Sequence, residues 1–321
     1  MSGDIKGKRG LVVASYGRLF ELWEDGNPAF SAQAVTRGKK TEVSVGDWVN
    51  FAPTSSSSSA SQSVIESIET RINEVKRSDA FRTKWLAANV DLAVLVIAAD
   101  PPFSDELATR VRCAADVAQV PLLVLLNKSD LIDSMTPQAS ARLRQQCDDF
   151  TTSNAHVVTI SAKLQDDLLQ ELKPHLEGKT SLMLGQSGMG KSTVLNRLVP
   201  SAQARTQEVS RVLNSGKHTT THSKMFCIDK DDAGFDARII DSPGFQSFGL
   251  GHLSMSQLQH AMPEFSNYLG HCRFSNCKHY EEPQCAVRKA VEDGLIGPAR
   301  YAAYKTIAHD IEFIDRANLR S

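Results

Sequence analysis

The fold of this chain is decided by one stretch, Gly185-Gln186-Ser187-Gly188-Met189-Gly190-Lys191-Ser192-Thr193. It follows an apolar run and precedes a segment with helical periodicity, so it lies where a buried strand turns into a helix. The spacing G-x-x-x-x-G-K-S allows backbone N–H groups to surround a β-phosphate. Lys191 can then neutralise the β- and γ-phosphates, and the Ser192 hydroxyl can bind Mg²⁺. The stretch predicts a site for a nucleoside triphosphate.

Alternating strand and helix patterns surround this phosphate loop. Continuous apolar runs indicate strands buried on both faces, and apolar residues at helical spacing lie between them. This alternation predicts a doubly wound, mostly parallel sheet, in which the carboxyl ends of the strands meet at one ligand-binding crevice. The apolar runs are residues 92–97, 121–126, 157–160, 181–184, 224–228 and 238–240, the last two expected to pair at an edge, and the helical patterns are residues 104–119, 137–150, 167–176 and 193–198.

Two polar motifs at strand ends indicate which base the site reads. Asn127-Lys128-Ser129-Asp130 follows one apolar run, and Ser161-Ala162-Lys163 follows another. A fixed Asp130 carboxylate can accept hydrogen bonds from N1–H and the N2 amino group of guanine, whereas adenine would leave it unpaired at a cost of about 1–3 kcal/mol. Lys128 can lie along the base, Asn127 can join neighbouring loops, and a backbone N–H of the second motif can donate to guanine O6. We therefore predict a GTP site rather than an ATP site.

Contacts to Mg²⁺ and the γ-phosphate are expected from two later stretches. Asp241-Ser242-Pro243-Gly244 offers a carboxylate for the metal and, at Gly244, a backbone N–H for the γ-phosphate. A polar run without periodicity at residues 215–222 contains three consecutive threonines, one of which is expected to close over the metal. An ordinary threonine-rich loop is the alternative interpretation of this run. The predicted magnesium ligands are Ser192, Thr220 and Asp241, with Thr219 and Thr221 as neighbours of Thr220.

The order of the motifs differs from that of ordinary small GTPases. Those proteins run phosphate loop, threonine switch, D-x-x-G, N-K-x-D and S-A-K, whereas here the last two motifs come first. Because chain ends lie at the surface and are often close together, the same sheet can be built with its ends moved. The sequence therefore predicts a circularly permuted GTPase in which D-x-x-G leads directly into the segment that follows it.

The residue expected to orient the attacking water also departs from the usual design. Many GTPases place glutamine directly after D-x-x-G, but Phe245 stands there and cannot form a hydrogen bond. The His218 imidazole, with an ordinary pKa of about 6.5, is mostly neutral at pH 7 and can accept a hydrogen bond from water. A surface histidine without a catalytic role, His222 or Gln246 are the alternatives. The predicted catalytic residues are His218, Thr220 and Lys191.

A cluster of thiols near the C-terminus predicts a structural zinc site. Cys272, Cys277, His279 and Cys285 supply three thiolates and one imidazole, a complete tetrahedral set with no open position. In a reducing compartment such a cluster favours a metal over disulfides. So short a segment also lacks the apolar area to fold unaided, although reduced cysteines without a metal are the other interpretation. His271 is a competing ligand.

The first part of the chain has a different pattern. Five short alternating runs separated by turn residues, without a convincing helix, predict a small closed barrel of the OB type. Such barrels often bind oligonucleotides, and a structural module without RNA contacts is the alternative. The five runs are residues 11–14, 19–23, 30–35, 43–51 and 63–72, followed by a connection at 71–84, and a serine-rich surface loop is expected at 54–63.

These patterns together predict a multidomain α/β chain. We expect an OB-like β-barrel at residues 1–78, a circularly permuted P-loop GTPase domain at 79–262, and a zinc-binding helical domain at 263–321, with helices at 286–293 and 298–316. The 321 residues carry a net charge of −1, so a nucleic-acid partner would have to be met by local patches or by shape. No apolar run reaches the roughly 18 residues of a membrane span, and residues 1–9 are polar. We expect a cytoplasmic monomer with no membrane partner.

The motifs as a set resemble the RsgA/YjeQ family of small ribosomal subunit-dependent GTPases. The resemblance covers nearly the whole chain: a barrel, the permuted motifs N-K-S-D, G-Q-S-G-M-G-K-S-T, G-K-H-T-T-T and D-S-P-G-F, and a terminal C-x₄-C-x-H-x₅-C knuckle. It implies GTP hydrolysis stimulated by the small ribosomal subunit during late maturation of that subunit. It further implies that the barrel and the zinc domain both contact rRNA.

Two hypotheses from other classes compete with a GTPase that acts as an assembly checkpoint. A metabolic kinase or ATPase is disfavoured by Asp130 and would be tested by nucleotide competition. An RNA-binding module with a merely structural nucleotide would bind its partner equally well with GDP and with a non-hydrolysable GTP analogue.

Overall fold

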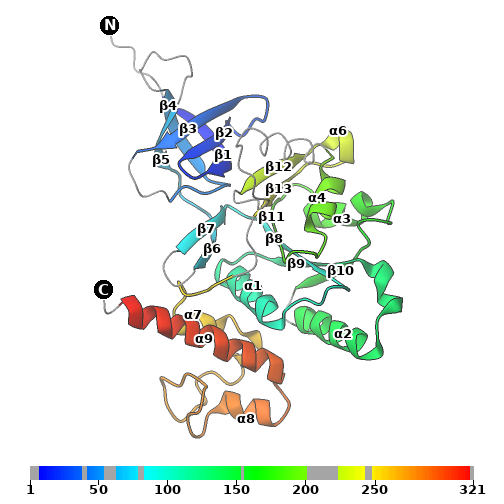
Figure 1. Ribbon diagram of the computed structural model, residues 1–321. Helices are drawn as coiled ribbons and strands as arrows, with labels where there is room; N and C mark the ends of the chain where they lie inside the picture. Colours follow the sequence, from blue (N-terminus) through cyan, green and yellow to red (C-terminus); the bar gives the residue numbers. More distant parts are fainter. Residues whose placement is uncertain are drawn as a thin grey trace.

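The computed structural model describes residues 7–37, 42–53, 63–78, 83–152, 155–200, 223–242 and 248–318 (Figure 1). Its elements form a β-barrel, a six-stranded sheet covered by helices, and a mainly helical C-terminal part. Among the described residues, no helix is long and apolar enough to cross a membrane.

The N-terminal barrel is closed, as the alternating runs predict. Strand β1 pairs with both β2 and β4, while β5 pairs with both β3 and β4, so no edge is left unpaired around the ring. Alternate residues point inward, among them Val12, Phe20 and Phe51, all at most 1% exposed. A Cβ on Gly10 would lie 2.8 Å from the Phe51 ring, so glycine is required there. The strands are β1 Lys8–Tyr16, β2 Leu19–Glu24, β3 Ser31–Thr36, β4 Trp48–Pro53 and β5 Ser63–Ile68.

A hairpin follows the barrel where the sequence predicts only a connection. Strands β6 (Glu74–Ser78) and β7 (Thr83–Ala88) form a separate two-stranded sheet. The expected boundary between residues 78 and 79 falls inside this hairpin. Charged residues dominate the first strand, in which Val75 and Ser78 alone are buried, so apolar alternation is too weak to reveal it.

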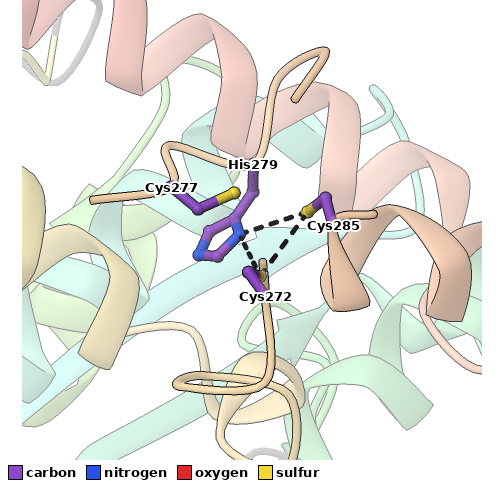
Figure 2. A group of neighbouring side chains, drawn as sticks. All are labelled: Cys272, Cys277, His279 and Cys285. Atoms are coloured by element: carbon purple, nitrogen blue, oxygen red, sulfur yellow. Dashed lines mark hydrogen bonds between the residues drawn. The ribbon is translucent and has the colours of Figure 1, made fainter. Parts of the chain in front are cut away.

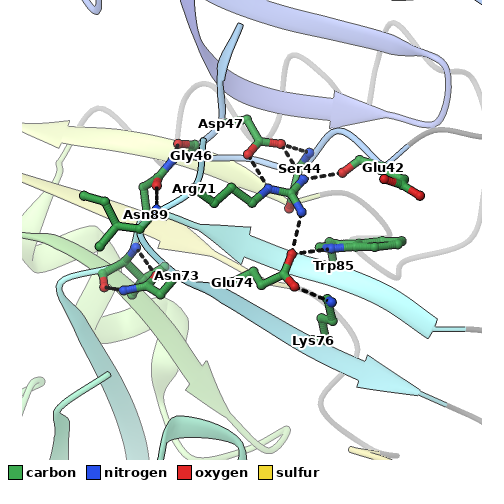
Figure 3. Close-up of polar contacts among 12 residues, drawn as sticks. Glu42, Ser44, Gly46, Asp47, Arg71, Asn73, Glu74, Lys76, Trp85 and Asn89 are labelled. Atoms are coloured by element: carbon green, nitrogen blue, oxygen red, sulfur yellow. Dashed lines mark hydrogen bonds and ion pairs between the residues drawn. The ribbon is translucent and has the colours of Figure 1, made fainter. Parts of the chain in front are cut away.

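A polar network joins this hairpin to the barrel (Figure 3). The Arg71 guanidinium donates to Asp47 Oδ1 at 2.7 Å and to Glu74 Oε2 at 2.6 Å, and Trp85 Nε1 also donates to Glu74 Oε2 at 2.9 Å. Because the Asp47 side chain is fully buried, Arg71 supplies the compensating charge that burial requires. The barrel is therefore fastened to the rest of the chain at this point.

The central sheet has the strand order β10-β9-β8-β11-β13-β12, with the first five strands parallel and β12 antiparallel at the edge. The predicted paired edge is thus formed by β12 and β13. Strand β12 also pairs with β1 at Lys224 and Ala14, which joins the sheet to the barrel. The elements are β8 Leu92–Ala98, α1 Asp105–Val117, β9 Leu122–Asn127, η1 Ser129–Ser134, α2 Pro137–Thr152, β10 His156–Thr159, α3 Leu168–Leu176, β11 Thr180–Gly185, α4 Lys191–Leu198, β12 Lys224–Ile228, α6 Lys230–Ala233 and β13 Ala237–Asp241.

The C-terminal part is built around one long helix. Helix α9 packs against α1 of the central domain and against α7 (Figure 1). Its Tyr304, Ile307 and Ile311 are fully buried in the same core as Phe265. The elements are α7 Met255–His260, η2 Pro263–Phe265, α8 Ala286–Glu292 and α9 Pro298–Asn318.

Candidate functional site

The phosphate loop lies between β11 and α4, and its glycines fit a cradle for phosphate. Gly188 and Gly190 both have a φ of 87°, a left-handed conformation that favours glycine. A Cβ on Gly190 would lie 2.2 Å from Asn127 Nδ2, and one on Gly185 would lie 2.9 Å from Val96 O. Side chains are thus excluded from the loop, and the N-terminus of α4 opens directly beside it.

Asn127 holds the phosphate loop and the Ser161-Ala162-Lys163 loop together. Its Nδ2 donates to Met189 O at 2.9 Å, and its Oδ1 accepts from the Ala162 N–H at 2.9 Å. The residue is 3% exposed, so both hydrogen bonds are shielded from water. Asn127 therefore fixes the distance between the phosphate loop and the Ser161-Ala162-Lys163 loop.

Asp130 is oriented by a neighbour from the other base motif. Its Oδ1 accepts a hydrogen bond from Ser161 Oγ at 2.6 Å, which leaves Oδ2 for a ligand. In the Ser161-Ala162-Lys163 loop, the N–H groups of Ser161 and Ala162 already donate hydrogen bonds within the protein. The Lys163 N–H is therefore the one in this loop that can donate to guanine O6. Lys128, with φ 58°, donates from Nζ to Asp100 O at 2.7 Å.

Arg197 is a further contributor that sequence patterns did not reveal. It lies on α4, directly downstream of the phosphate loop, and its guanidinium donates to Ala162 O at 3.1 Å and Gln165 O at 2.7 Å. These bonds tie the helix that begins at the phosphates to the loop that faces the base. An arginine on a helix has no local sequence signature for such a contact.

The charged groups predicted for phosphate and Mg²⁺ lie together. Lys191 Nζ forms an ion pair with Asp241 Oδ1, and the two side chains are 18% and 16% exposed. Ser192 is exposed at the start of α4. Gln186 Oε1 in the same loop is buried without a hydrogen-bond partner. The donor set, the open serine and the glycine cradle all fit a magnesium-bound triphosphate, whereas His218, Thr220 and Gly244 lie outside the described residues.

The predicted metal ligands gather in one cluster (Figure 2). The ligand atoms of Cys272, Cys277, His279 and Cys285 all lie within 4.8 Å of one another, and His279 Nδ1 is 3.5 Å from Cys272 Sγ and 3.3 Å from Cys285 Sγ. The competing residue His271 is exposed and outside the cluster. This donor set fits a tetrahedral metal site.

The cluster is partly buried and is supported by a neighbouring helix. Burial raises the pKa of the Cys277 thiol, so a metal ion that binds there has to displace the thiol proton. Helix α9 supports the loop from behind, because Tyr301 Oη donates to His279 O at 2.6 Å and Tyr304 Oη donates to Lys278 O at 2.8 Å. The loop that carries the ligands is thus fixed against α9, and such supporting contacts hold metal ligands in place.

The strand order and the loops at the strand ends define a circularly permuted GTPase. The sequence model of the RsgA GTPase family matches residues 68–251. The chain is 43% identical to "Small ribosomal subunit biogenesis GTPase RsgA" of Burkholderia pseudomallei strain 668, over 96% of this chain and 94% of that protein. It is 42% identical to the protein of the same name in Paraburkholderia phymatum, over 96% of this chain and 93% of that protein. The chain therefore belongs to the RsgA GTPase family.

Solved structures agree with this assignment. The crystal structure of YjeQ from Thermotoga maritima superposes with a TM-score of 0.67 at 26% identity, over 95% of this chain and 98% of that one. The structure of YloQ, described as a circularly permuted GTPase, superposes with a TM-score of 0.63 at 24% identity, over 98% of both chains, and supports the fold.

Proposed function

We propose that this protein hydrolyses GTP in response to the small ribosomal subunit and acts as a checkpoint in late maturation of that subunit. The observation that carries the nucleotide assignment is the Ser161–Asp130 hydrogen bond, which orients the Asp130 carboxylate and leaves one of its oxygens free for the donors of guanine. The partner is supported by the names of relatives that match along nearly the whole chain. We also propose that it works as a cytoplasmic monomer.

The phosphate loop accounts for triphosphate binding. Backbone N–H groups at the start of α4 surround the phosphates, and Lys191 leaves its ion pair with Asp241 to bind the β- and γ-phosphates. Asp241 would then be available as a ligand of Mg²⁺. Mg²⁺ held by Ser192, Thr220 and Asp241 would neutralise charge that develops between the β- and γ-phosphates. Gly244 would donate its N–H to the γ-phosphate, and His218 would orient the attacking water.

The base is selected by hydrogen bonds that the loops have already arranged. Asp130 accepts from guanine N1–H and N2–H, Lys163 donates to O6, and Lys128 lies along the base. Asn127 and Arg197 keep these groups at a fixed distance from the phosphates. An ATPase or kinase is disfavoured, because adenine would leave Asp130 without its donors.

The zinc ion is proposed to be structural. The four ligands Cys272, Cys277, His279 and Cys285 leave no position for substrate, and α9 fixes their loop. We propose a division into three domains at 78/79 and 262/263, with the β6–β7 hairpin as the connection across the first boundary. We further propose that the barrel and the zinc domain contact rRNA on either side of the GTPase.

The deciding experiment is GTP turnover with and without purified small ribosomal subunits. We expect at least about tenfold stimulation, because we propose that docking on the partner completes the catalytic arrangement around the γ-phosphate. A Lys191→Ala variant should show no stimulated turnover. Equal turnover with and without subunits, in protein that binds GTP, would contradict the proposed function. Partner affinity that does not differ between GDP and a non-hydrolysable GTP analogue would instead favour the RNA-binding module with a structural nucleotide.

A further inference from the structure

The segment between β8 and α1, residues 99–104, lies directly beside the nucleotide site and is called the β8–α1 loop below. Strand β8 pairs in parallel with β9, and Ala98 lies opposite Asn127. The Ala99 N–H then donates to Asn127 O at 3.2 Å. The loop therefore leaves the sheet next to the N-K-S-D motif, at the carboxyl edge of the strands where ligands of such sheets bind.

The carbonyl of Asp100 in this loop holds the side chain of Lys128. Lys128 Nζ donates to Asp100 O at 2.7 Å. The backbone of Lys128 has a φ of 58°, which residues other than glycine rarely adopt, so neighbouring contacts have to maintain it. With the ammonium fixed at Asp100 O, the methylene stem can lie along the apolar face of guanine. The position of the Asp100 carbonyl therefore decides where that stem lies.

The next residue of the β8–α1 loop borders the phosphate loop. A Cβ on Gly188 would lie 3.4 Å from Pro101 Cγ and 3.6 Å from Pro101 Cδ. Gly188 is one of the two phosphate-loop glycines with a φ of 87°. The proline ring thus lies beside the turn that has to keep its shape for backbone N–H groups to surround the β-phosphate. One short segment contacts the base side and the phosphate side of the same site.

The other side of the β8–α1 loop is not packed against protein. A cavity of about 620 Å³ lies between this loop, η1 and the start of α2. Asp100, Pro102 and Phe103 line the cavity, whereas Pro101 between them does not. The far end of the loop is fastened by Gln146 of α2, whose Nε2 donates to Phe103 O at 3.3 Å. The contacts on the nucleotide side therefore decide where the middle of the loop lies.

We propose that Asp100 and Pro101 are positioning residues for guanine nucleotides, Asp100 through its carbonyl on Lys128 and Pro101 through its ring on the phosphate loop. This inference rests on the proposed function, because it concerns the same site. The base and the β-phosphate are common to GDP and GTP, so disturbing the loop weakens binding of both nucleotides by a similar factor. Contacts to the γ-phosphate are left intact. KM for GTP therefore rises, whereas kcat does not change.

The test compares Pro101→Ala with Pro102→Ala in the full-length protein. The two adjacent prolines are both exposed, but the ring of Pro101 lies beside Gly188 and that of Pro102 lines the cavity. We expect Pro101→Ala to release a fluorescent GDP analogue about tenfold faster than the parent and to raise KM for GTP by a similar factor, with kcat within about twofold. Pro102→Ala should match the parent in all three quantities. Because Pro101 is exposed, its substitution removes no buried group.

A double-mutant cycle tests whether the loop acts through Lys128. Lys128→Met keeps an apolar stem and removes the ammonium that Asp100 O accepts. In that background we expect Pro101→Ala to accelerate release only about threefold, because one of the two contacts no longer exists. Fully additive effects would overturn the proposed role of the Asp100 carbonyl, and a fall in kcat with unchanged KM would overturn positioning of the bound nucleotide.

Failure of this inference and failure of the proposed function give different results. A parent protein that binds the GDP analogue, with equal release rates in Pro101→Ala and Pro102→Ala, would overturn the positioning role alone. A parent protein that binds neither GDP nor GTP would overturn the proposed function and this inference with it.

Discussion

The Ser78 hydroxyl accepts a hydrogen bond from the His252 backbone N–H at 2.9 Å and lies 3.1 Å from Nδ1 of the same histidine. Ser78 is the last residue of β6, and its own N–H donates to Gly249 O at 2.8 Å. A Cβ on Gly251 would lie 2.0 Å from Ile314 Cδ1 of α9. The chain that leaves the D-S-P-G motif is therefore fixed both to the hairpin beside the barrel and to the C-terminal helix.

This contact gives the protein a specific sensitivity to acid. Burial and the charge of Lys76 lower the pKa of His252 from 6.5 to about 4, with Glu74 opposing. The neutral ring is therefore favoured by folding, and its stabilising effect is complete above pH 6.5 and is lost as the pH falls towards 4. His252→Asn should show a smaller loss of unfolding free energy over that range in urea titrations. His260→Asn on the exposed face of α7 is the control, and identical pH slopes in parent and His252→Asn would contradict the assignment.

The Arg71–Asp47 pair should be one of the more costly contacts to break. Arg71→Met leaves the Asp47 carboxylate buried without its counter-charge, so we expect a loss of about 3 kcal/mol in unfolding free energy. Arg37→Met breaks an exposed pair with Glu66 at 3.5 Å and should cost less than about 1 kcal/mol. Urea unfolding of both variants provides the comparison. Similar losses of unfolding free energy in the two variants would contradict a special contribution from the buried Arg71–Asp47 pair.

Acid should weaken the same network. Burial acts to raise the pKa of Glu74, but hydrogen bonds from Lys76, Trp85 and Arg71 outweigh it and lower the pKa to about 2. This carboxylate therefore stabilises the fold above its ordinary pKa of 4.5, and the contribution is lost as the pH falls from there towards 2. Most of that range lies below the range in which His252 titrates, so the two effects overlap only between about pH 4 and pH 4.5.

Local chemistry explains which parts could be predicted from the sequence. The phosphate loop, the base motifs and the zinc ligands each depend on residue types at fixed short spacings, and those residues lie together in the structure. The β6–β7 hairpin could not be predicted from the sequence, because charged residues stabilise it through the Arg71 network and its strands lack apolar alternation. The Ser78–His252 contact joins residues 174 positions apart, and the Arg197 contacts span two elements. Such long-range contacts leave no periodic or local signature in one sequence.

Asp130→Asn should change which base is bound. The amide lacks the second acceptor that guanine N1–H and N2–H require, so GTP affinity should fall at least about tenfold and preference should move towards xanthosine triphosphate. Competition binding with the two nucleotides measures this change. Asp133→Asn, at an exposed position of the same short helix, should leave preference unaltered. Unchanged GTP affinity in Asp130→Asn would remove this residue from base recognition.

Cys277→Ser should release the metal without emptying the nucleotide site. Loss of one thiolate removes much of the contribution of the metal to folding of the terminal segment, whereas the phosphate loop belongs to the central sheet. We expect zinc content to fall well below one equivalent by elemental analysis, with GTP binding retained. Cys147→Ser on α2 lies outside the cluster and should keep its zinc. Full zinc occupancy in Cys277→Ser would refute the ligand set.

The last prediction concerns the water that attacks GTP. Phe245 occupies the position at which many GTPases carry a glutamine, so another group must accept the hydrogen bond from that water. His218 adjoins the switch threonines, and its neutral imidazole has the required lone pair at pH 7. If docking on the small subunit brings the ring to the γ-phosphate, the ring contributes only in the stimulated reaction.

His218→Ala should therefore leave GTP and GDP binding near normal and reduce subunit-stimulated hydrolysis at least about tenfold, or about 1.4 kcal/mol of transition-state stabilisation. Single-turnover rates with saturating small subunits measure the chemical step. His222→Ala is the matched control, because it removes an imidazole from the same run without removing the proposed acceptor. Stimulated turnover within about twofold of the parent in His218→Ala would assign the water to Gln246, to backbone groups or to the partner, and a selective loss in His222→Ala would move the role to that residue.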